Sequence, residues 1–388
     1  MNACSIVEMN SSQNDASRVL IADDQVPVLE ALQLLLKSHG YSTEVVSDPS
    51  QVLPALETDP FDVVLMDMNY DRDTTAGDEG LELVSQIRSH DRNMPVLVMT
   101  AWGSVELAVE AIRRGASDFV QKPWQNQQLL QKLRTQIDRG QLQRRAQRSG
   151  EEELREAQEI QSKLLPSHLP KISDYEIAAI TQPIRFVGGD YYNVVRVSER
   201  ETALCIGDVA GKGLAAALLM SSLQAALKPL IWQKLPPREL CRRLNRMLCE
   251  ITPVSKFISF FYGVLDNQEH RLTYCNAGHN PPIMVRGGKD VVELNAAGAV
   301  LGQFPDWSYE QSEIRLKPGD SLYMFTDGLV EACNEEGEPF GETGLANIAK
   351  QNPLASAADL QKQLMHTASQ HCAGKFHDDA TLLVIRAV

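Results

Sequence analysis

The sequence predicts two domains of different fold class, an α/β domain followed by an α+β domain, with a helical segment between them. In the first third of the chain, short apolar runs alternate with amphipathic stretches, which is typical of a parallel sheet with helices on both faces. The stretch 125–165 is rich in Gln, Arg, Leu and Glu and has no proline, which favours helix. Strand-like runs then return with apolar-rich helices grouped between them, which indicates antiparallel sheets covered by helices.

These patterns set the expected boundaries. A chain of 388 residues is long enough for two domains of ordinary size. We expect a disordered polar leader at 1–17, the α/β domain at 18–138, a helical linker at 139–169 and the α+β domain at 170–388.

Composition excludes several classes of protein. The net charge of −14 argues against nucleic-acid binding, which needs basic surface. Gln, Lys and Pro interrupt the most apolar stretch, 214–232, so we expect a buried helix there and no membrane span. The seven cysteines are scattered and form no CxxC pair, and the leader does not read as a signal peptide. The sequence therefore predicts a cytoplasmic protein.

The first domain shows both of its element types clearly. Three apolar runs are expected as strands buried on both faces: Val19–Ala22, Val63–Met66 and Val96–Met99. Three amphipathic stretches are expected as helices: Pro27–Ser38, Leu81–Ser89 and Val105–Arg114.

The linker is predicted to be helical in two pieces. Gly140 and the pair Ser149-Gly150 interrupt its apolar spacing, so we expect a hinge between the pieces. A basic part precedes an acidic part, as in a solvated helix. A homodimer formed through the linker and a solvated single helix both stay open.

The second domain is expected to contain more strands than helices. The strand-like segments are Tyr175–Ile180, Tyr191–Val197, Thr202–Ile206, Phe257–Leu265, Ser321–Phe325 and Thr381–Ile385. The predicted helices are Leu214–Trp232, Arg238–Cys249, Glu342–Lys350 and Ala357–Gln370.

Three carboxylates, a hydroxyl and a lysine follow strands of the first domain. Asp23 and Asp24 follow the first, Asp67 the third, Thr100 the fourth and Lys122 the fifth. In a parallel sheet these ends meet at one edge, where ligands bind. Carboxylates so close would repel one another unless a cation such as Mg²⁺ neutralised them. One carboxylate can then attack phosphorus and become an aspartyl phosphate. We assign Asp23 and Asp24 to Mg²⁺, Asp67 to attack, and Thr100 and Lys122 to the phosphoryl group.

This set resembles the receiver domain of bacterial response regulators, which has a flavodoxin-like doubly wound sheet. The segments Asp-Asp, Leu-Met-Asp, Met-Thr-Ala and Asp-Phe-Val-Gln-Lys-Pro occur in the required order. The resemblance implies that the backbone carbonyl of Asn69 completes the metal site and that the rotamer of Phe119 follows phosphorylation. It also implies a sensor histidine kinase as phosphodonor. The loop Asp67–Gly80 is longer than usual and carries four more acids, Asp71, Asp73, Asp78 and Glu79.

A second set of aspartates lies beside glycines in the second domain. The motifs are Val-Gly-Gly-Asp190, Gly-Asp208-Val-Ala-Gly-Lys-Gly, Phe-Thr-Asp327-Gly and His-Asp378-Asp379-Ala-Thr. Glycine allows positive φ and close backbone approach, so the chain can fold tightly around ions. Aspartates gathered without Cys or His pairs indicate oxygen-ligated Mg²⁺ or Mn²⁺ rather than zinc. Two such ions can activate water and polarise a phosphoryl oxygen.

These motifs strongly resemble the PPM-type protein phosphatases of the bacterial SpoIIE/RsbU branch, which have an α+β layered sandwich. Three further blocks carry the similarity: residues 157–166, 207–220 and Asn-Ala-Gly-His-Asn-Pro-Pro at 276–282. The resemblance implies that Asp208 bridges two ions, with the Val209 carbonyl as a further ligand. It implies that Asp327 and Asp378 bind one ion, and that Asp190 acts through water bound to the metal.

The same resemblance concerns three further residues, and for each of them it leaves an alternative open. Asp379 competes with Asp378 as the ligand, and Asp378 is preferred. Arg185 stands where family members can place a phosphate-binding arginine, and a surface arginine is the alternative. His279 is expected to hold its loop rather than to act in catalysis.

Two functional hypotheses follow. The first is a regulated protein serine/threonine phosphatase in which phosphorylation of Asp67 controls the dimetal centre. The resemblance implies an anti-sigma-factor antagonist as its substrate. The second is a non-catalytic adaptor with a phosphatase-like domain. The sequence favours the enzyme, because all four metal-binding aspartates are present. A DNA-binding regulator is excluded, because no basic helix-turn-helix follows the first domain.

Overall fold

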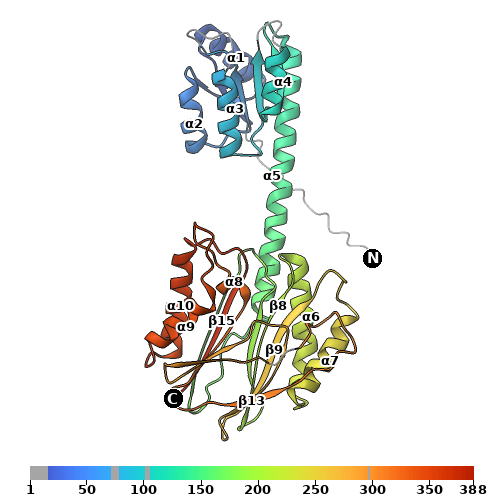
Figure 1. Cartoon of the computed structure of the whole chain (residues 1–388). Helices are drawn as coiled ribbons and strands as arrows, with labels where there is room; N and C mark the ends of the chain where they lie inside the picture. The colour runs from blue at the N-terminus through green and yellow to red at the C-terminus, as the bar shows by residue number, and fades with distance from the viewer. Residues whose placement is uncertain (1–15, 71–77, 101–104, 296–297) are drawn as a thin grey trace, which may run out of the picture. The chain divides into compact units, whose positions relative to one another are not determined.

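The structure is a computed structural model, and it describes residues 16–70, 78–100, 105–295 and 298–388 (Figure 1). Nearly all of the expected leader lies outside these ranges. The chain divides into two compact units, Met1–Glu151 and Glu152–Val388. The division falls inside the stretch 139–169 that we expected to be a linker. Each unit is described by itself below.

The first unit contains a five-stranded sheet in the order β2-β1-β3-β4-β5. All neighbouring strands are parallel, as expected from the alternation of strands and helices. The strands are β1 Arg18–Ala22, β2 Ser42–Val46, β3 Val63–Asp67, β4 Val96–Thr100 and β5 Asp118–Gln121. The three predicted strands are confirmed, and β2 and β5 complete the sheet.

Helices cover both faces of this sheet (Figure 1). They are α1 Val26–Ser38, α2 Val52–Thr58 after a short 3₁₀ turn at Pro49–Gln51, α3 Asp78–His90, α4 Val105–Arg113 and α5 Asn126–Ser162. Apolar residues of α1 and α5 pack on one face, and those of α2, α3 and α4 pack on the other. This is the doubly wound arrangement that the sequence predicts.

The predicted break in the linker helix is wrong, because α5 runs as one helix from Asn126 to Ser162. Gly140 lies inside it, and a Cβ at this position would come within 2.6 Å of the Pro95 side chain. Glycine here permits close packing rather than bending. A single glycine costs a helix only about 1 kcal/mol relative to alanine, which neighbouring turns easily offset.

The second unit contains two five-stranded sheets, in the orders β13-β10-β9-β8-β7 and β12-β11-β14-β15-β6. All of their pairings are antiparallel. The strands of the first sheet are β7 Tyr191–Arg196, β8 Glu201–Val209, β9 Ile258–Asp266, β10 Arg271–Ala277 and β13 Ser312–Arg315. Those of the second are β6 Tyr175–Gln182, β11 Ile283–Arg286, β12 Asp290–Glu293, β14 Ser321–Phe325 and β15 Ala380–Ala387.

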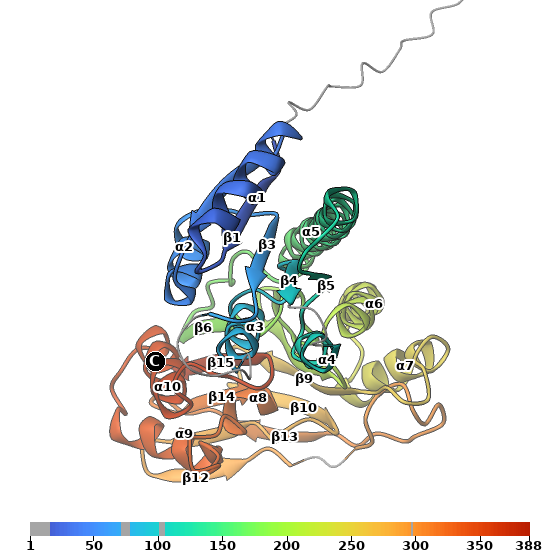
Figure 2. The ribbon, with the colours of Figure 1, turned by 90° about the horizontal axis from the view of Figure 1, so that it is seen from above.

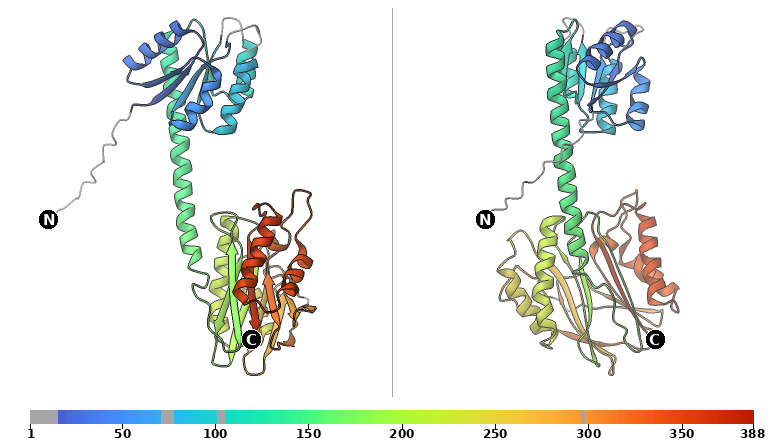
Figure 3. Two further views of the ribbon diagram at one scale, coloured as in Figure 1. Left: turned by 90° about the vertical axis from the view of Figure 1, so that its left-hand side faces the viewer. Right: turned by 180° about the vertical axis from the view of Figure 1, so that it is seen from behind.

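The two sheets form the middle of a four-layered sandwich (Figures 2 and 3). Helices α6 Leu214–Ile231 and α7 Pro237–Cys249 pack on the first sheet. Helices α9 Gly341–Gln351 and α10 Ala357–His371 pack on the second, and the four-residue helix α8 spans Asp327–Val330. Apolar side chains such as Phe261 and Met324 fill the space between the sheets. The predicted α+β layering is confirmed.

Helix α6 is the one helix among the described residues that is long and apolar enough to cross a membrane by length and composition. Its residues Met220, Leu223 and Leu227 are fully buried in the core between this helix and the first sheet. Leu214 and Leu218 are exposed, so the structure buries one face of this helix, whereas the sequence predicted a buried helix as a whole.

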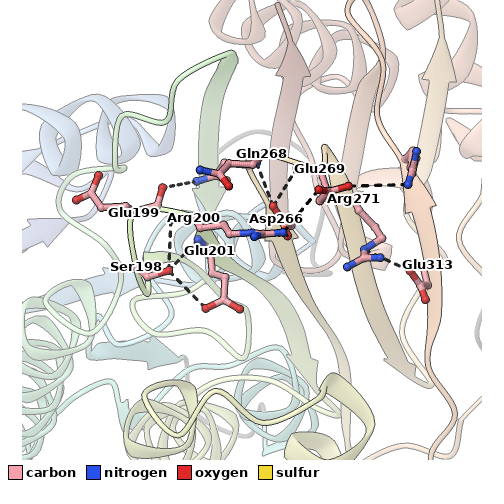
Figure 4. Close-up of polar contacts among 11 residues, drawn as sticks. Ser198, Glu199, Arg200, Glu201, Asp266, Gln268, Glu269, Arg271 and Glu313 are labelled. Carbon is pink, nitrogen blue, oxygen red and sulfur yellow. Dashed lines mark hydrogen bonds and ion pairs between the residues drawn. The ribbon is translucent and has the colours of Figure 1, made fainter.

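Ion pairs join two turns of the first sheet (Figure 4). Arg200, in the turn before β8, contacts the Asp266 carboxylate at the end of β9 at 2.7 Å. Asp266 also accepts hydrogen bonds from the backbone N–H groups of Gln268 and Glu269. The hydrogen bond from Arg200 is the main reason that the pKa of Asp266 falls to about 2. This network ties neighbouring strand ends together.

Candidate functional sites: a phosphoacceptor pocket and an aspartate cluster

The first site lies at the carboxyl ends of the parallel strands, as predicted. Carboxylate oxygens of Asp23, Asp24 and Asp67 lie within 4.8 Å of one another. Asp23 and Asp67 are almost completely buried. Burial raises the pKa of Asp67, and the nearby Lys122 ammonium partly offsets that rise. Oxygen ligands this close together suit a hard cation such as Mg²⁺.

Lys122 joins two of these carboxylates. Its Nζ lies 2.7 Å from Asp23 Oδ2 and 2.9 Å from Asp67 Oδ2. Burial lowers the pKa of Lys122, but its hydrogen bonds and ion pairs with the two aspartates outweigh this effect, so the pKa is raised overall. The lysine therefore stays charged and stands where a phosphoryl group on Asp67 would need a cation.

The other predicted receiver residues lie around the same edge. Thr100 is buried at the end of β4, and its carbonyl accepts a hydrogen bond from the Lys122 N–H. Phe119, on β5, is 36% exposed, and Lys132 Nζ lies 5.0 Å from its ring centroid. Asn69 is exposed just after β3. Asp71 and Asp73 of the long loop lie outside the described residues.

The structure adds Tyr70 to this site, which sequence reasoning missed. Its hydroxyl donates a hydrogen bond to the Ala22 carbonyl at 3.1 Å. Burial, and then the charges of Asp67, Asp23 and Asp24, raises the pKa of Tyr70 well above its usual value. The tyrosine therefore stays neutral and covers one side of the acidic pocket.

The second site gathers aspartates from four distant segments of the phosphatase-like unit. Asp190 precedes β7 and Asp208 lies near the end of β8. Asp327 begins α8, and Asp378 lies just before β15. The charges of Asp327 and Asp378 both act on Asp208, which shows that the four segments converge.

The electrostatics of this cluster are unfavourable without a counter-ion. Burial, followed by repulsion from Asp327 and Asp378, raises the pKa of Asp208 to about 7. A hydrogen bond with Asp190 partly offsets this rise. Burial and the charge of Asp208 raise the pKa of Asp190 well above its usual value. Burial also raises the pKa of Asp327, with Glu331 and Asp378 adding repulsion.

Two threonines hold Asp190 in place. The hydroxyls of Thr326 and Thr381 donate to Asp190 Oδ2 at 2.8 and 2.6 Å. The Thr381 N–H donates in turn to the Thr326 hydroxyl at 2.9 Å. All three side chains are buried. Both threonines lie in motifs identified from the sequence, Phe-Thr-Asp-Gly and Asp-Asp-Ala-Thr. In those motifs only the aspartates were assigned a function.

The adjacent Asp378 and Asp379 have different surroundings. Both carboxylate oxygens of the buried Asp379 accept backbone N–H groups, from Ile184 and Gly189, each at 2.9 Å. Asp378 is 36% exposed and pairs with Lys212 Nζ at 2.8 Å. Asp379 is thus occupied in holding backbone, whereas the Asp378 carboxylate is partly exposed and, among the described residues, bonded to a side chain only through Lys212. Asp378 as the metal ligand remains a prediction.

The two glycines before Asp190 allow this close packing. A Cβ on Gly189 would lie 3.0 Å from the Val209 carbonyl oxygen and 3.2 Å from Asp208 Oδ1. A Cβ on Gly188 would clash with the Asp379 carboxylate. The Val-Gly-Gly-Asp segment can therefore approach the cluster only because it lacks these side chains.

Two cations, Arg185 and Lys256, lie against the Gly211-Lys212-Gly213 loop that follows Asp208. Arg185 Nη1 lies 3.3 Å from the position that a Cβ on Gly213 would take, and the Lys256 ammonium lies against Gly211. Arg185 is exposed, and its guanidinium makes no hydrogen bond or ion pair within the described ranges. It also lines an open pocket of about 620 Å³ beside Leu214. Positive charge next to the acidic cluster suits an anionic ligand.

His279 holds its loop, as predicted. Its Nδ1 lies 2.8 Å from the Ser259 hydroxyl. Its backbone N–H donates to Asn276 Oδ1 at 2.7 Å, and its carbonyl accepts from Asn276 Nδ2 at 2.9 Å. Burial lowers the pKa of His279 to about 4, so the ring is neutral near pH 7.

The donor set of the second site fits divalent cations. Its side-chain donors are carboxylate oxygens, whose pKa values are raised first by burial and then by their mutual repulsion, and a bound cation would stabilise the charged form against both effects. The Val209 carbonyl oxygen, next to Gly189, supplies a neutral donor of the same hard type. Oxygen donors without thiolate or imidazole favour Mg²⁺ or Mn²⁺.

Comparisons with known proteins support the division into these two units. Residues 19–134 match the family described as response regulator receiver domain, and residues 198–388 match Stage II sporulation protein E (SpoIIE). Phosphoserine phosphatase RsbU of Bacillus subtilis is 32% identical over 235 residues, which is 60% of this chain and 70% of RsbU. Response regulator protein FleR of Pseudomonas aeruginosa is 36% identical over 115 residues, or 30% of this chain and 23% of FleR.

Two other relatives of the second unit are matched over less of their length than RsbU is. Protein IcfG of Synechocystis sp. is 24% identical over 261 residues, which is 60% of this chain and 41% of IcfG. Phosphoserine phosphatase RsbP of Bacillus subtilis is matched over 49% of its length. The chain thus spans less than half of each of these two proteins.

Solved structures agree on the fold of the second unit. The SiaA-PP2C domain of Pseudomonas aeruginosa superposes with a TM-score of 0.57 at 22% identity, covering 62% of this chain and 98% of that one. The SpoIIE PP2C phosphatase domain of Bacillus subtilis gives 0.50 at 21% identity, covering 56% and 64%. Family, relatives and fold agree, so the chain belongs to the SpoIIE family of metal-dependent protein phosphatases and carries a response regulator receiver domain before the phosphatase domain.

Proposed function

We propose that this protein hydrolyses phosphoserine and phosphothreonine on a partner protein, under the control of phosphorylation at Asp67. The observation that carries the proposal is the convergence of Asp190, Asp208, Asp327 and Asp378 from four separate segments, with pKa values raised at three of them. Carboxylates held together against their repulsion indicate a cation site. A non-catalytic adaptor does not require a cluster of buried carboxylates to bind its partner.

In this proposal Asp208 would be a ligand shared by two divalent ions, Mn²⁺ or Mg²⁺, and the Val209 carbonyl would be a further ligand. Asp327 and Asp378 would hold one of the ions. When bound, the ions supply an activated water and withdraw charge from the phosphoryl oxygens. The chain's own residues position the reactants.

Asp190 orients the attacking water, and the hydroxyls of Thr326 and Thr381 fix its carboxylate. Arg185 binds a phosphoryl oxygen of the substrate. In support, its guanidinium is exposed and makes no hydrogen bond or ion pair in the part of the chain that the structure describes. Lys212 contacts Asp378 and is available to neutralise charge at the edge of the site.

The proposed substrate is an anti-sigma-factor antagonist carrying phosphoserine or phosphothreonine. Support comes from the relatives RsbU and RsbP, each named a phosphoserine phosphatase. The reaction and its partner are proposed to be cytoplasmic, with no part for nucleic acid or membrane.

We further propose that the receiver domain uses Mg²⁺ and takes a phosphoryl group from a sensor histidine kinase onto Asp67. Lys122, which contacts Asp67 at 2.9 Å, and Thr100 would then hold the phosphoryl oxygens. Phe119 would change rotamer with the modification. The conformational change would reach the metal centre through α5, either by a shift of this helix or by dimerisation along it. Such coupling requires two states whose equilibrium both sites bias.

The test is Mn²⁺-dependent hydrolysis of 4-nitrophenyl phosphate by the full-length protein, with and without beryllofluoride as a mimic of phosphorylated Asp67. The proposal predicts turnover that Asp208→Ala abolishes and that beryllofluoride changes. Asp67→Ala, as the matched control, should keep turnover and lose the response to beryllofluoride. Absence of metal-dependent turnover in both states would reject the enzyme and favour the adaptor.

A further inference from the structure

The last turn of α5 is hydrogen-bonded to the segment that carries Asp190. Gln161 Nε2 donates to the Gly188 carbonyl at 2.7 Å. The Gly188 N–H donates back to Gln161 Oε1 at 3.0 Å. One side-chain amide therefore satisfies both backbone polar groups of this glycine. A primary amide offers a donor and an acceptor side by side without carrying a charge.

Gly188 stands at the centre of the contacts that shape the aspartate cluster. Its Cα packs so closely on the Asp379 carboxylate that a Cβ would clash. The next residue, Gly189, donates its N–H to Asp379 Oδ2 at 2.9 Å and lies against Asp208 Oδ1 and the Val209 carbonyl. Asp190 follows directly. A shift at Gly188 would therefore move several groups of the cluster together.

Two consecutive glycines have more backbone freedom than other residues, so this segment needs external restraints. Asp379 restrains it from one side through Gly189, and Gln161 restrains it from the other. The chain after Gln161 is itself anchored, because Leu164 and Leu165 pack against the core of the phosphatase unit. The end of α5 is thus connected both to the sandwich and to the Val-Gly-Gly-Asp segment.

We propose that Gln161 is a positioning residue for the metal centre: its amide fixes Gly188 so that Asp190 and the Val209 carbonyl hold the geometry that the ions require. This inference rests on the proposed function and deepens it, because it names the residue at which a change in α5 would reach the cluster. It also gives a physical role to the block 157–166, which contains none of the metal-binding aspartates.

The test is equilibrium Mn²⁺ binding to the metal-stripped, full-length protein, measured by titration calorimetry for wild type and Gln161→Leu. Removing a residue that orients metal-site groups typically weakens metal binding 10- to 100-fold. We expect Mn²⁺ affinity to fall about tenfold, which is roughly 1.4 kcal/mol. The Mn²⁺ concentration for half-maximal hydrolysis of 4-nitrophenyl phosphate should rise in parallel. The kcat at saturating Mn²⁺ should change by no more than about threefold, because binding of the ions restores the geometry.

Gln158→Leu is the matched control. Gln158 lies one turn earlier on the same helix, lines the pocket beside Arg185, and makes no hydrogen bond within the described ranges. Its substitution should leave Mn²⁺ binding unchanged. An equal weakening in both variants would overturn the proposal, because it would show a general effect of the helix rather than the amide pair. Unchanged Mn²⁺ binding in Gln161→Leu would overturn it as well.

A second variant keeps the proposal testable if Gln161→Leu does not fold, as judged by circular dichroism. Gln161→Glu has the same shape and still accepts from the Gly188 N–H, but at neutral pH it cannot donate to the Gly188 carbonyl. It should also weaken Mn²⁺ binding, and wild-type affinity in this variant would contradict the proposal. Because metal binding is measured without substrate, these outcomes are distinct from a failure of the protein to hydrolyse phosphate.

Discussion

The neighbouring aspartates Asp378 and Asp379 give the sharpest test of how residues are assigned in the cluster. Asp379 is 5% exposed and accepts two backbone N–H groups, each at 2.9 Å. Asp379→Asn keeps one acceptor oxygen but turns an NH₂ group toward the other N–H. Leaving a buried donor without its charged acceptor costs roughly 1.5–3 kcal/mol. We expect a loss of about 2 kcal/mol in the free energy of unfolding.

Asp378→Asn should behave differently in the same assay. Its side chain and that of its partner Lys212 are both 36% exposed, and an ion pair of this kind contributes about 0–1 kcal/mol. Its charge also repels Asp208 and Asp327, so its removal relieves strain in the metal-free protein. We therefore expect unchanged or slightly higher stability, but strongly reduced Mn²⁺ binding.

The assay is thermal unfolding of the phosphatase unit in the presence of a chelator, so that metal binding does not contribute to the measured stability. For a domain of this size, 1 kcal/mol corresponds to about 2–4 °C in Tm. Asp379→Asn should lower Tm by about 4–8 °C, and Asp378→Asn should change it by less than about 2 °C. The opposite pattern would refute the reasoning, because it would make Asp379 the exposed ligand and Asp378 the structural residue.

Three further predictions follow from the same contacts. Without metal, the raised pKa of Asp208 means that the folded state holds a proton that the unfolded state has released, so the stability should fall as pH rises from about 4 to about 7. Thermal unfolding in the presence of a chelator, measured across this pH range, checks the prediction. A stability that did not change with pH would contradict it. The lowered pKa of Asp266 has the opposite sign, so the ion pair with Arg200 stabilises the protein above about pH 4 and is lost toward pH 2. Because Arg200 is solvent-exposed, Arg200→Ala should lower the stability only slightly at pH 7, and its curve of stability against pH should merge with that of wild type near pH 2. Arg185→Ala should raise KM for 4-nitrophenyl phosphate about tenfold with little change in kcat. Substitution of another exposed arginine, Arg315→Ala, is the control and should change neither constant. A fall in kcat alone would assign Arg185 a role other than substrate binding.

Much of the fold could be predicted because its central strands are buried on both faces and read as continuous apolar runs. Val63–Asp67 and Val96–Thr100 are buried at every position, and both were recognised. The edge strand Ser42–Val46 is only partly buried and mixes polar with apolar residues, so no apolar run identified it. The short edge strand Asp290–Glu293 was missed for the same reason.

Residues of the aspartate cluster could be predicted from sequence only where the residue type alone indicates metal binding. Aspartates beside glycines identified the cluster from sequence, and in the structure Asp190, Asp327 and Asp378 all influence the pKa of Asp208. Thr326, Thr381 and Gln161 were not identified, because a hydroxyl or an amide becomes informative only when its partner in space is known. The motifs around them were the available signal, since each lies within a block already singled out.

The central claim is that four converging aspartates form a centre for two divalent ions, with Asp208 shared between them. The most direct measurement is the number of Mn²⁺ ions bound at equilibrium by wild type and by Asp208→Ala. The account predicts that the variant binds two fewer ions than wild type while its receiver domain stays folded. Equal numbers of bound ions in the two proteins would contradict it, whatever activity either protein shows.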